Sequence, residues 1–112
     1  MAGAALKLLP ESKRMEMILQ KVEEEGVGLY GNPHHLREED DAFIMEIHEC
    51  PYCAEIARRA QAGGPAVSQP CCHIATAVYR EMIEWGTGNP HATQETACIA
   101  TGDPACVFRI EK

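Results

Sequence analysis

The chain has 112 residues, of which 46% are hydrophobic and only 5% aromatic, and this length fits a single domain with a thin core. Seventeen acidic residues against ten basic ones give a net charge of −7, which argues against nucleic acid or an anionic membrane surface as a partner. With no apolar run near the ~20 residues of a membrane span and no recognisable signal peptide, we expect a cytoplasmic protein. In that compartment, clustered cysteines typically bind metal or serve in redox chemistry.

The first predicted element is a helix over residues 10–26. Apolar residues recur there at the spacing of one helix face. They are Met15, Ile18, Leu19 and Val22. Residues 27–41 are rich in Gly, Asn, Pro and charge, which predicts a loop, and we expect the pair His34-His35 within it to be exposed.

A strand and a short helix are predicted next. Residues 42–49 alternate apolar and polar side chains, with Phe43 and Met45 on one face, which predicts a strand. The motif Cys50-Pro-Tyr-Cys53 follows directly, and residues 54–62 predict a short helix.

The second half of the chain predicts a longer helix over residues 70–85 and a hairpin of two strands, 91–99 and 106–111. The helix begins with the residues Cys71-Cys72-His73 and has a predicted apolar stripe. That stripe consists of Ala75, Val78, Tyr79 and Met82. The turn Thr101-Gly-Asp-Pro joins the two strands, because Gly tolerates positive φ and Asp and Pro favour tight reversals. Together these elements predict an α+β fold: a small single domain with an antiparallel sheet whose C-terminal hairpin packs against two or three helices.

Thiol groups are predicted to converge at this hairpin. Cys98 and Cys106 lie across the turn from each other, and Cys71 or Cys72 opens the preceding helix. A structural Zn²⁺ site takes four ligands in a tetrahedron, with sulfur at about 2.3 Å. The N-terminus of a helix also favours the thiolate that a metal requires. The pattern therefore predicts a metal site.

The hairpin carries the pattern E-x-x-C-x-x-x-G-D-x-x-C-x-F-x-I, which runs from Glu95 to Ile110. It resembles the signature of the 4-vinyl reductase domain family over about residues 65–112. In the phenol-sensing branch of that family, one Glu and three Cys bind zinc. The resemblance therefore implies a set of four zinc ligands. They are Cys72, Glu95, Cys98 and Cys106, with Cys71 as the alternate for Cys72.

One geometric condition applies to this ligand set. Side chains alternate along a strand, so Glu95 and Cys98 point to opposite faces of an unbroken one. Both can contact one ion only if the strand ends or bulges near Ala97.

The resemblance also implies a function. It suggests a module across residues 1–112 that binds or senses a hydrophobic small molecule, with structural zinc, acting as a homodimer. Four protein ligands leave the metal no open position for catalysis, and no glycine motif for a nucleotide is present. We therefore expect a binding role rather than an enzyme.

The Cys50-Pro-Tyr-Cys53 motif lies outside the pattern of that family. It is identical to the glutaredoxin motif, and a Cys-x-x-Cys at the start of a helix suits thiol–disulfide exchange. Three interpretations stay open: a second metal site that includes Cys71 and His73, a redox pair, or packing thiols. The alternative function is accordingly a thiol–disulfide oxidoreductase.

Overall fold

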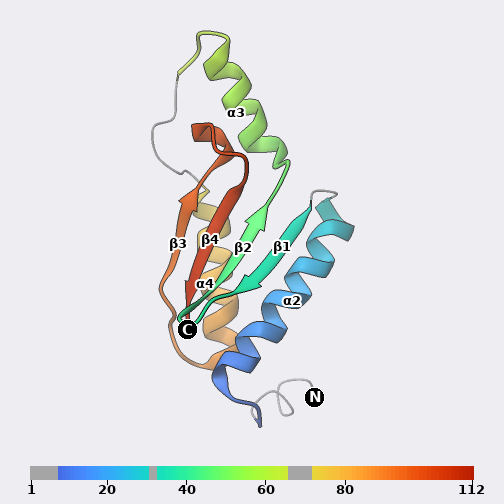
Figure 1. Cartoon of the computed structure of the whole chain (residues 1–112), viewed down its shortest axis with the longest axis vertical. Helices are drawn as coiled ribbons and strands as arrows, with labels where there is room; N and C mark the ends of the chain where they lie inside the picture. The colour runs from blue at the N-terminus through green and yellow to red at the C-terminus, as the bar shows by residue number, and fades with distance from the viewer. Residues whose placement is uncertain (1–7, 31–32, 66–71) are drawn as a thin grey trace.

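The computed structural model describes residues 8–30, 33–65 and 72–112. These residues form three α-helices, one 3-10 helix and a four-stranded sheet, so the predicted α+β fold is confirmed (Figure 1). In chain order the elements are α2 (Glu11–Tyr30), β1 (His34–Glu38), β2 (Ala42–Ile47), α3 (Pro51–Gln61), α4 (His73–Thr87), β3 (Thr93–Ala97), η1 (Ile99–Thr101) and β4 (Cys106–Glu111).

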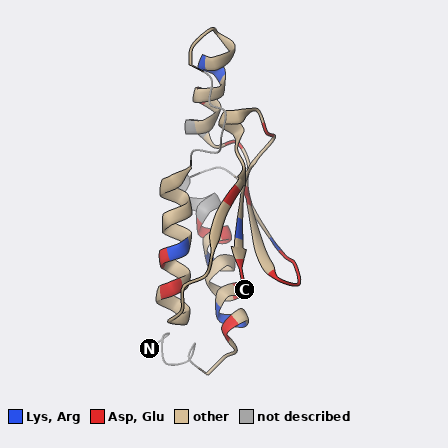
Figure 2. Ribbon diagram, turned by 90° about the vertical axis from the view of Figure 1, so that its left-hand side faces the viewer, with Lys and Arg blue, Asp and Glu red and all other residues tan. Residues whose placement is uncertain are grey.

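The sheet has the strand order β1-β2-β4-β3, and each neighbouring pair is antiparallel. Its central strands β2 and β4 supply seven of the fifteen buried hydrophobic residues of the described chain. Phe43 lies opposite Ile110 and Met45 lies opposite Phe108, and all four side chains are fully buried. Because side chains alternate along a strand, these residues share the face that helices α2 and α4 cover (Figure 2).

Helices α2 and α4 pack on this face through Met15, Leu19, Tyr79 and Ile83. Each such side chain contributes about 1.5–3 kcal/mol when it is fully buried. The Tyr79 ring packs against Phe108 with 5.1 Å between ring centroids. Among the described helices, none has both the length and the apolar character that crossing a bilayer requires.

The predicted loop over residues 27–41 is wrong in part, because the first helix continues to Tyr30 and strand β1 follows. β1 is an edge strand with mainly polar residues, so it lacks the apolar alternation that would have predicted it. One of its backbone N–H groups, that of Leu36, donates to the Glu23 carboxylate of α2. His34 is buried, whereas His35 is exposed as predicted.

Helix α4 ends at Thr87, two residues later than predicted, and Gly88 directly after it takes the left-handed conformation with φ 79°. Of its predicted stripe, Tyr79 is buried, but Val78 is 48% exposed, and Ile83 is buried in addition. The prediction failed here because α4 is apolar on two opposite faces. Periodicity alone does not tell which of two such faces is buried.

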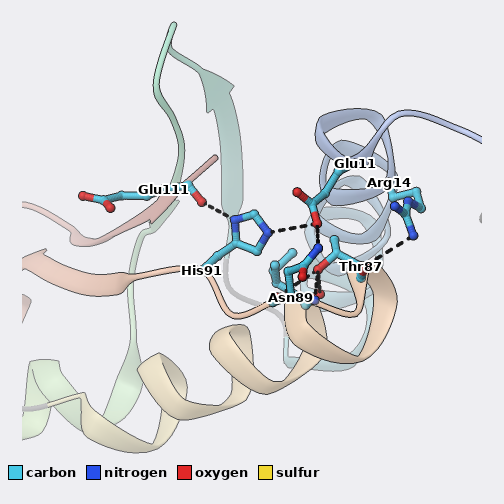
Figure 3. Close-up of polar contacts among 7 residues, drawn as sticks. Glu11, Arg14, Thr87, Asn89, His91 and Glu111 are labelled. Carbon is cyan, nitrogen blue, oxygen red and sulfur yellow. Dashed lines mark hydrogen bonds and ion pairs between the residues drawn. The ribbon is translucent and has the colours of Figure 1, made fainter.

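A polar cluster ties the start of α2 to the end of β4 (Figure 3). Nδ1 of His91 lies 2.7 Å from the backbone oxygen of Glu111 and donates to it, because a carbonyl oxygen can only accept. Nε2 of the same ring lies 3.7 Å from Oε1 of Glu11. The Asn89 side chain donates to Glu11 as well, and this hydrogen bond, with the nearby His91, holds the pKa of Glu11 below its ordinary value. The cluster anchors the end of β4 opposite to Cys106.

Candidate metal centre

Four cysteine sulfurs from three parts of the chain lie within 4.8 Å of one another. Cys53 lies in the first turn of α3, and Cys72 is the residue that precedes α4. Cys98 precedes η1, and Cys106 begins β4. We call these four residues the sulfur cluster. It joins α3 and α4 to the C-terminal hairpin.

The distances within the sulfur cluster match a single tetrahedral ion. The Sγ atom of Cys72 lies 3.2 Å from that of Cys53, 3.9 Å from that of Cys98 and 4.0 Å from that of Cys106. Cys98 lies 3.8 Å from Cys53 and 4.0 Å from Cys106, again between Sγ atoms. A tetrahedron with metal–sulfur bonds of 2.3 Å has edges of about 3.8 Å. An iron–sulfur cluster places several irons and sulfides between its thiolates and needs wider spacing.

The sulfur cluster is shielded from water. Cys53, Cys98 and Cys106 are each at most 3% exposed, and Cys72 is half-buried. Burial raises the pKa of the Cys53 and Cys72 thiols and raises the pKa of Cys106 to about 11. Without a metal these thiols are therefore neutral at pH 7, and metal binding has to displace their protons.

The strand that leads to Cys98 is irregular at the predicted place. The register of β3 against β4 shifts between Glu95 and Ala97, and the strand ends at Ala97. The bulge or strand end near Ala97, which joint ligation by Glu95 and Cys98 requires, is thus present. It turns the chain so that Cys98 faces the buried side of the hairpin.

The turn after Cys98 holds this residue through its backbone. The Asp103 carboxylate accepts hydrogen bonds from the Cys98 N–H at 2.9 Å and from the Thr101 hydroxyl at 3.0 Å. Gly102 takes φ 99°, a left-handed conformation that is strained for a residue with a side chain. The same turn also contacts the sulfur cluster directly, because the Ile99 N–H lies 3.4 Å from the sulfur of Cys106. Such a donor lowers the cost of ionising that thiol.

Glu95 stands beside the sulfur cluster and holds the start of α4. Its Oε1 accepts a hydrogen bond from the Cys72 backbone N–H at 2.8 Å. Its carboxylate also contributes to the raised pKa of Cys72, after burial and the contact with the Cys53 thiol. Its other oxygen, Oε2, is buried and has no hydrogen-bond partner within the described ranges.

The predicted ligands and the predicted second site meet in one place. The structure brings Cys72, Cys98 and Cys106 together and adds Cys53, which the sequence analysis had placed with the second site. Cys50 is half-buried and precedes α3, and His73 is exposed in the first turn of α4. Cys71 lies outside the described residues.

The position of Cys53 follows from the register of the sheet. Ile47, at the end of β2, lies opposite Cys106, at the start of β4. The chain therefore leaves β2 beside Cys106 and begins α3 there. A prediction of this strand pairing would have pointed to Cys53, whereas the local Cys-x-x-Cys spacing did not.

Comparisons with known proteins give one family and one relative. The sequence model of a family described as methanogen output domain 1 matches residues 26–111. A relative, the bacteriochlorophyll synthase 23 kDa chain of Cereibacter sphaeroides, is 39% identical over 64 residues. The alignment covers 54% of this chain and 29% of the relative, so the chain spans less than a third of that protein's length. No solved structure matches the chain.

Proposed function

The chain belongs to the methanogen output domain 1 family, and from this premise we propose that it is a zinc-containing module that binds or senses a small hydrophobic molecule. The observation that carries the metal part is the sulfur cluster, in which four thiols lie within 4.8 Å of one another. All four cysteines fall inside the matched residues 26–111.

Zinc is the ion that we propose for this centre. Thiolates are soft ligands that suit zinc, and four of them in a tetrahedron close the coordination shell. A closed site of this kind stabilises a fold instead of activating a water molecule. The zinc ion would join α3, α4 and the hairpin through Cys53, Cys72, Cys98 and Cys106. The set implied by the family resemblance, with Glu95 in place of Cys53, is the competing arrangement.

The hydrophobic ligand and the homodimer come from similarity. The hairpin pattern resembles the 4-vinyl reductase domain family, and the relative is by its name a chain of bacteriochlorophyll synthase. Both point to an apolar small molecule as the class of ligand, and the resemblance implies two copies of the chain per assembly.

The thiol–disulfide alternative has less support from the geometry. An exchange reaction needs an accessible thiol with a lowered pKa. Cys53 is 3% exposed, and burial raises the pKa of its thiol. This favours a metal ligand over a redox nucleophile.

The first test is the zinc content of the full chain purified without added metal or chelator, measured by native mass spectrometry. We expect one zinc per chain. Cys53→Ser should lose it, whereas Cys50→Ser is the matched control and should keep it, because Cys50 lies outside the sulfur cluster. Retention of zinc by Cys53→Ser together with its loss in Glu95→Gln would select the competing ligand set.

A chelator experiment separates the metal and redox functions. With zinc bound, the four clustered thiols should resist a thiol reagent at pH 7 until a chelator is added. Removal of the metal should also lower the melting temperature, because metal binding is coupled to folding. A chain without metal, in which one thiol at Cys50 or Cys53 reacts rapidly, would instead be a thiol–disulfide oxidoreductase.

A further inference from the structure

The polar cluster at the end of the sheet opposite to the sulfur cluster contains a buried nitrogen without a hydrogen bond. Nδ1 of His91 donates to the backbone oxygen of Glu111 at 2.7 Å, so the neutral imidazole carries its proton on Nδ1 and a lone pair on Nε2. Nε2 is buried and has no hydrogen-bond partner in residues 8–30, 33–65 and 72–112. The side chain of His91 is only 6% exposed, and unpaired nitrogens at such buried positions are rare in folded proteins.

A carboxylate faces this lone pair. Oε1 of Glu11, the first residue of α2, lies 3.7 Å from Nε2 of His91 (Figure 3). Two atoms that both accept hydrogen bonds repel each other unless a proton or a cation lies between them. Two ligand atoms at about 2.1 Å from one tetrahedral ion are about 3.4 Å apart. The observed separation therefore suits a shared divalent ion after a small shift of either side chain.

The surroundings of this pair favour a transition-metal ion. A backbone carbonyl that accepts from the other ring nitrogen is the usual support of a metal-bound histidine, because it fixes the tautomer and the orientation of the ring. Helix α4 ends beside the pair at Thr87, and its C-terminal carbonyls attract positive charge, which offsets the positive N-terminus of α2. Arg14 donates to the backbone oxygen of Thr87 on the far side of Glu11 from His91 (Figure 3). Imidazole suits zinc, nickel or copper, whereas calcium and magnesium take oxygen ligands.

We propose that His91 and Glu11 form a second metal site, which binds a divalent transition-metal ion between Nε2 of His91 and the carboxylate of Glu11. The Glu11 side chain is 37% exposed, so water can reach the ion and complete its coordination shell. The inference goes beyond the proposed function and does not depend on the sulfur cluster. Two protein ligands bind an ion less tightly than four thiolates, so we expect this site to fill only when metal is added. The ion would join α2 to the segment that leads into β3.

A nickel titration of the full, zinc-loaded chain tests the site. NMR of the imidazole groups follows all five histidines of the chain during the titration. Before nickel is added, neutral His91 should carry its proton on Nδ1. The signals of His91 should then broaden before those of the other histidines, because bound Ni²⁺ is paramagnetic. Native mass spectrometry of the same sample should show one added nickel per chain with the zinc retained. A proton on Nε2 of neutral His91, or broadening that begins at another histidine, would overturn the proposal.

Variants separate this pair from other histidines on the surface. His91→Gln should abolish nickel binding. Glu11→Gln should weaken it by about tenfold or more, because a neutral amide is a poorer ligand than a carboxylate. This variant should keep its fold, since the amide oxygen can still accept from Asn89. His35→Gln is the matched control, because His35 forms a close pair with His48, with 5.2 Å between ring centroids. Loss of nickel in the control, with binding retained in His91→Gln, would place the ion at that pair and refute the proposal.

A gain of affinity gives an independent check. The Asn89 side chain donates to the Glu11 carboxylate, so Asn89→Asp places a second carboxylate beside the ion. It should tighten nickel binding by about tenfold or more, because a carboxylate is a ligand and the amide donor is not. Without nickel the same change should lower the melting temperature, since two carboxylates repel each other. A lower melting temperature without tighter binding would show that the cluster has a structural role only, and would contradict the proposed position of the ion.

Discussion

Zinc binding should release four protons from the metal-free chain at pH 7. A thiol in water has a pKa of about 8.5. Burial raises the pKa of Cys53, Cys72 and Cys106 above that ordinary range. Each thiol therefore holds its proton until the metal takes the sulfur. If the Glu95 carboxylate replaced one thiol, only three protons would leave, because a carboxylate has none to release at this pH.

The proton count sets the size of the effect. Release of four protons lowers the apparent Kd for zinc by about ten-thousand-fold per pH unit, or ~5.4 kcal/mol, and release of three lowers it by about a thousand-fold. The charge changes in parallel. Four thiolates with one divalent ion make the formal charge of −7 more negative by two, whereas three thiolates make it more negative by one.

Isothermal titration calorimetry measures this count directly. Zinc is titrated at pH 7 against a competing chelator in buffers that differ in ionisation enthalpy, and the slope of the observed enthalpy gives the protons released. Cys50→Ser is the control and should leave the count at four. A count of three protons would indicate that Glu95 takes the place of one clustered cysteine as a zinc ligand. A count of two or fewer would refute the argument that burial keeps these thiols neutral.

Four further outcomes are expected. The metal-free fold should lose stability above about pH 8.5, because the buried Cys106 thiol, with a pKa of about 11, stays protonated in the folded chain and ionises on unfolding. Each such thiol lowers the free energy of unfolding by about 1.4 kcal/mol per pH unit in this window. A melting temperature that stays constant from pH 7 to 10 would disprove this reasoning. Asp103→Ala should weaken zinc binding by about 10–100-fold in chelator competition, because it removes the oxygen that accepts the hydrogen bond from the Cys98 N–H. Gly102→Ala should lower the free energy of unfolding in urea by about 1–2 kcal/mol, since a residue with a side chain is strained at φ 99°. An unchanged midpoint would argue against this strain. Phe108→Ala should lower the free energy of unfolding by about 3–5 kcal/mol and leave little native circular dichroism. A cooperative melt near that of the unaltered chain would contradict the central place of Phe108 in the core.

The hairpin half of the centre could be predicted because its residues are close in sequence. Cys98 and Cys106 are joined by a turn whose Gly and Asp have defined roles, and the irregularity near Ala97 follows from the two-residue period of a strand. Local rules of this kind need no knowledge of how distant strands pair.

The position of Cys53 could not be predicted in the same way. It depends on the pairing of β2 with β4, whose residues Ile47 and Cys106 are far apart in the chain. The Cys-x-x-Cys spacing suggests that Cys50 and Cys53 act together, but the fold buries Cys53 in the sulfur cluster and leaves Cys50 at the helix start. Strand β1 escaped prediction for a related reason, because an edge strand can be stabilised by backbone pairing with few apolar side chains.

Helix α3 extends past the end of the sheet and gives the molecule its length, 53 Å against 26 and 21 Å in the other directions (Figure 1). It packs against η1 and is anchored in its first turn by Cys53. An 11-residue helix is about 16 Å long, so a rotation of about 10° at that turn moves its far end by about 3 Å. The helix is therefore held at its first turn by the sulfur cluster, and a tilt about that turn is largest at its other end. Arg58 and Arg59 lie at this far end, so a tilt of α3 about Cys53 would displace their side chains more than those of the first turn.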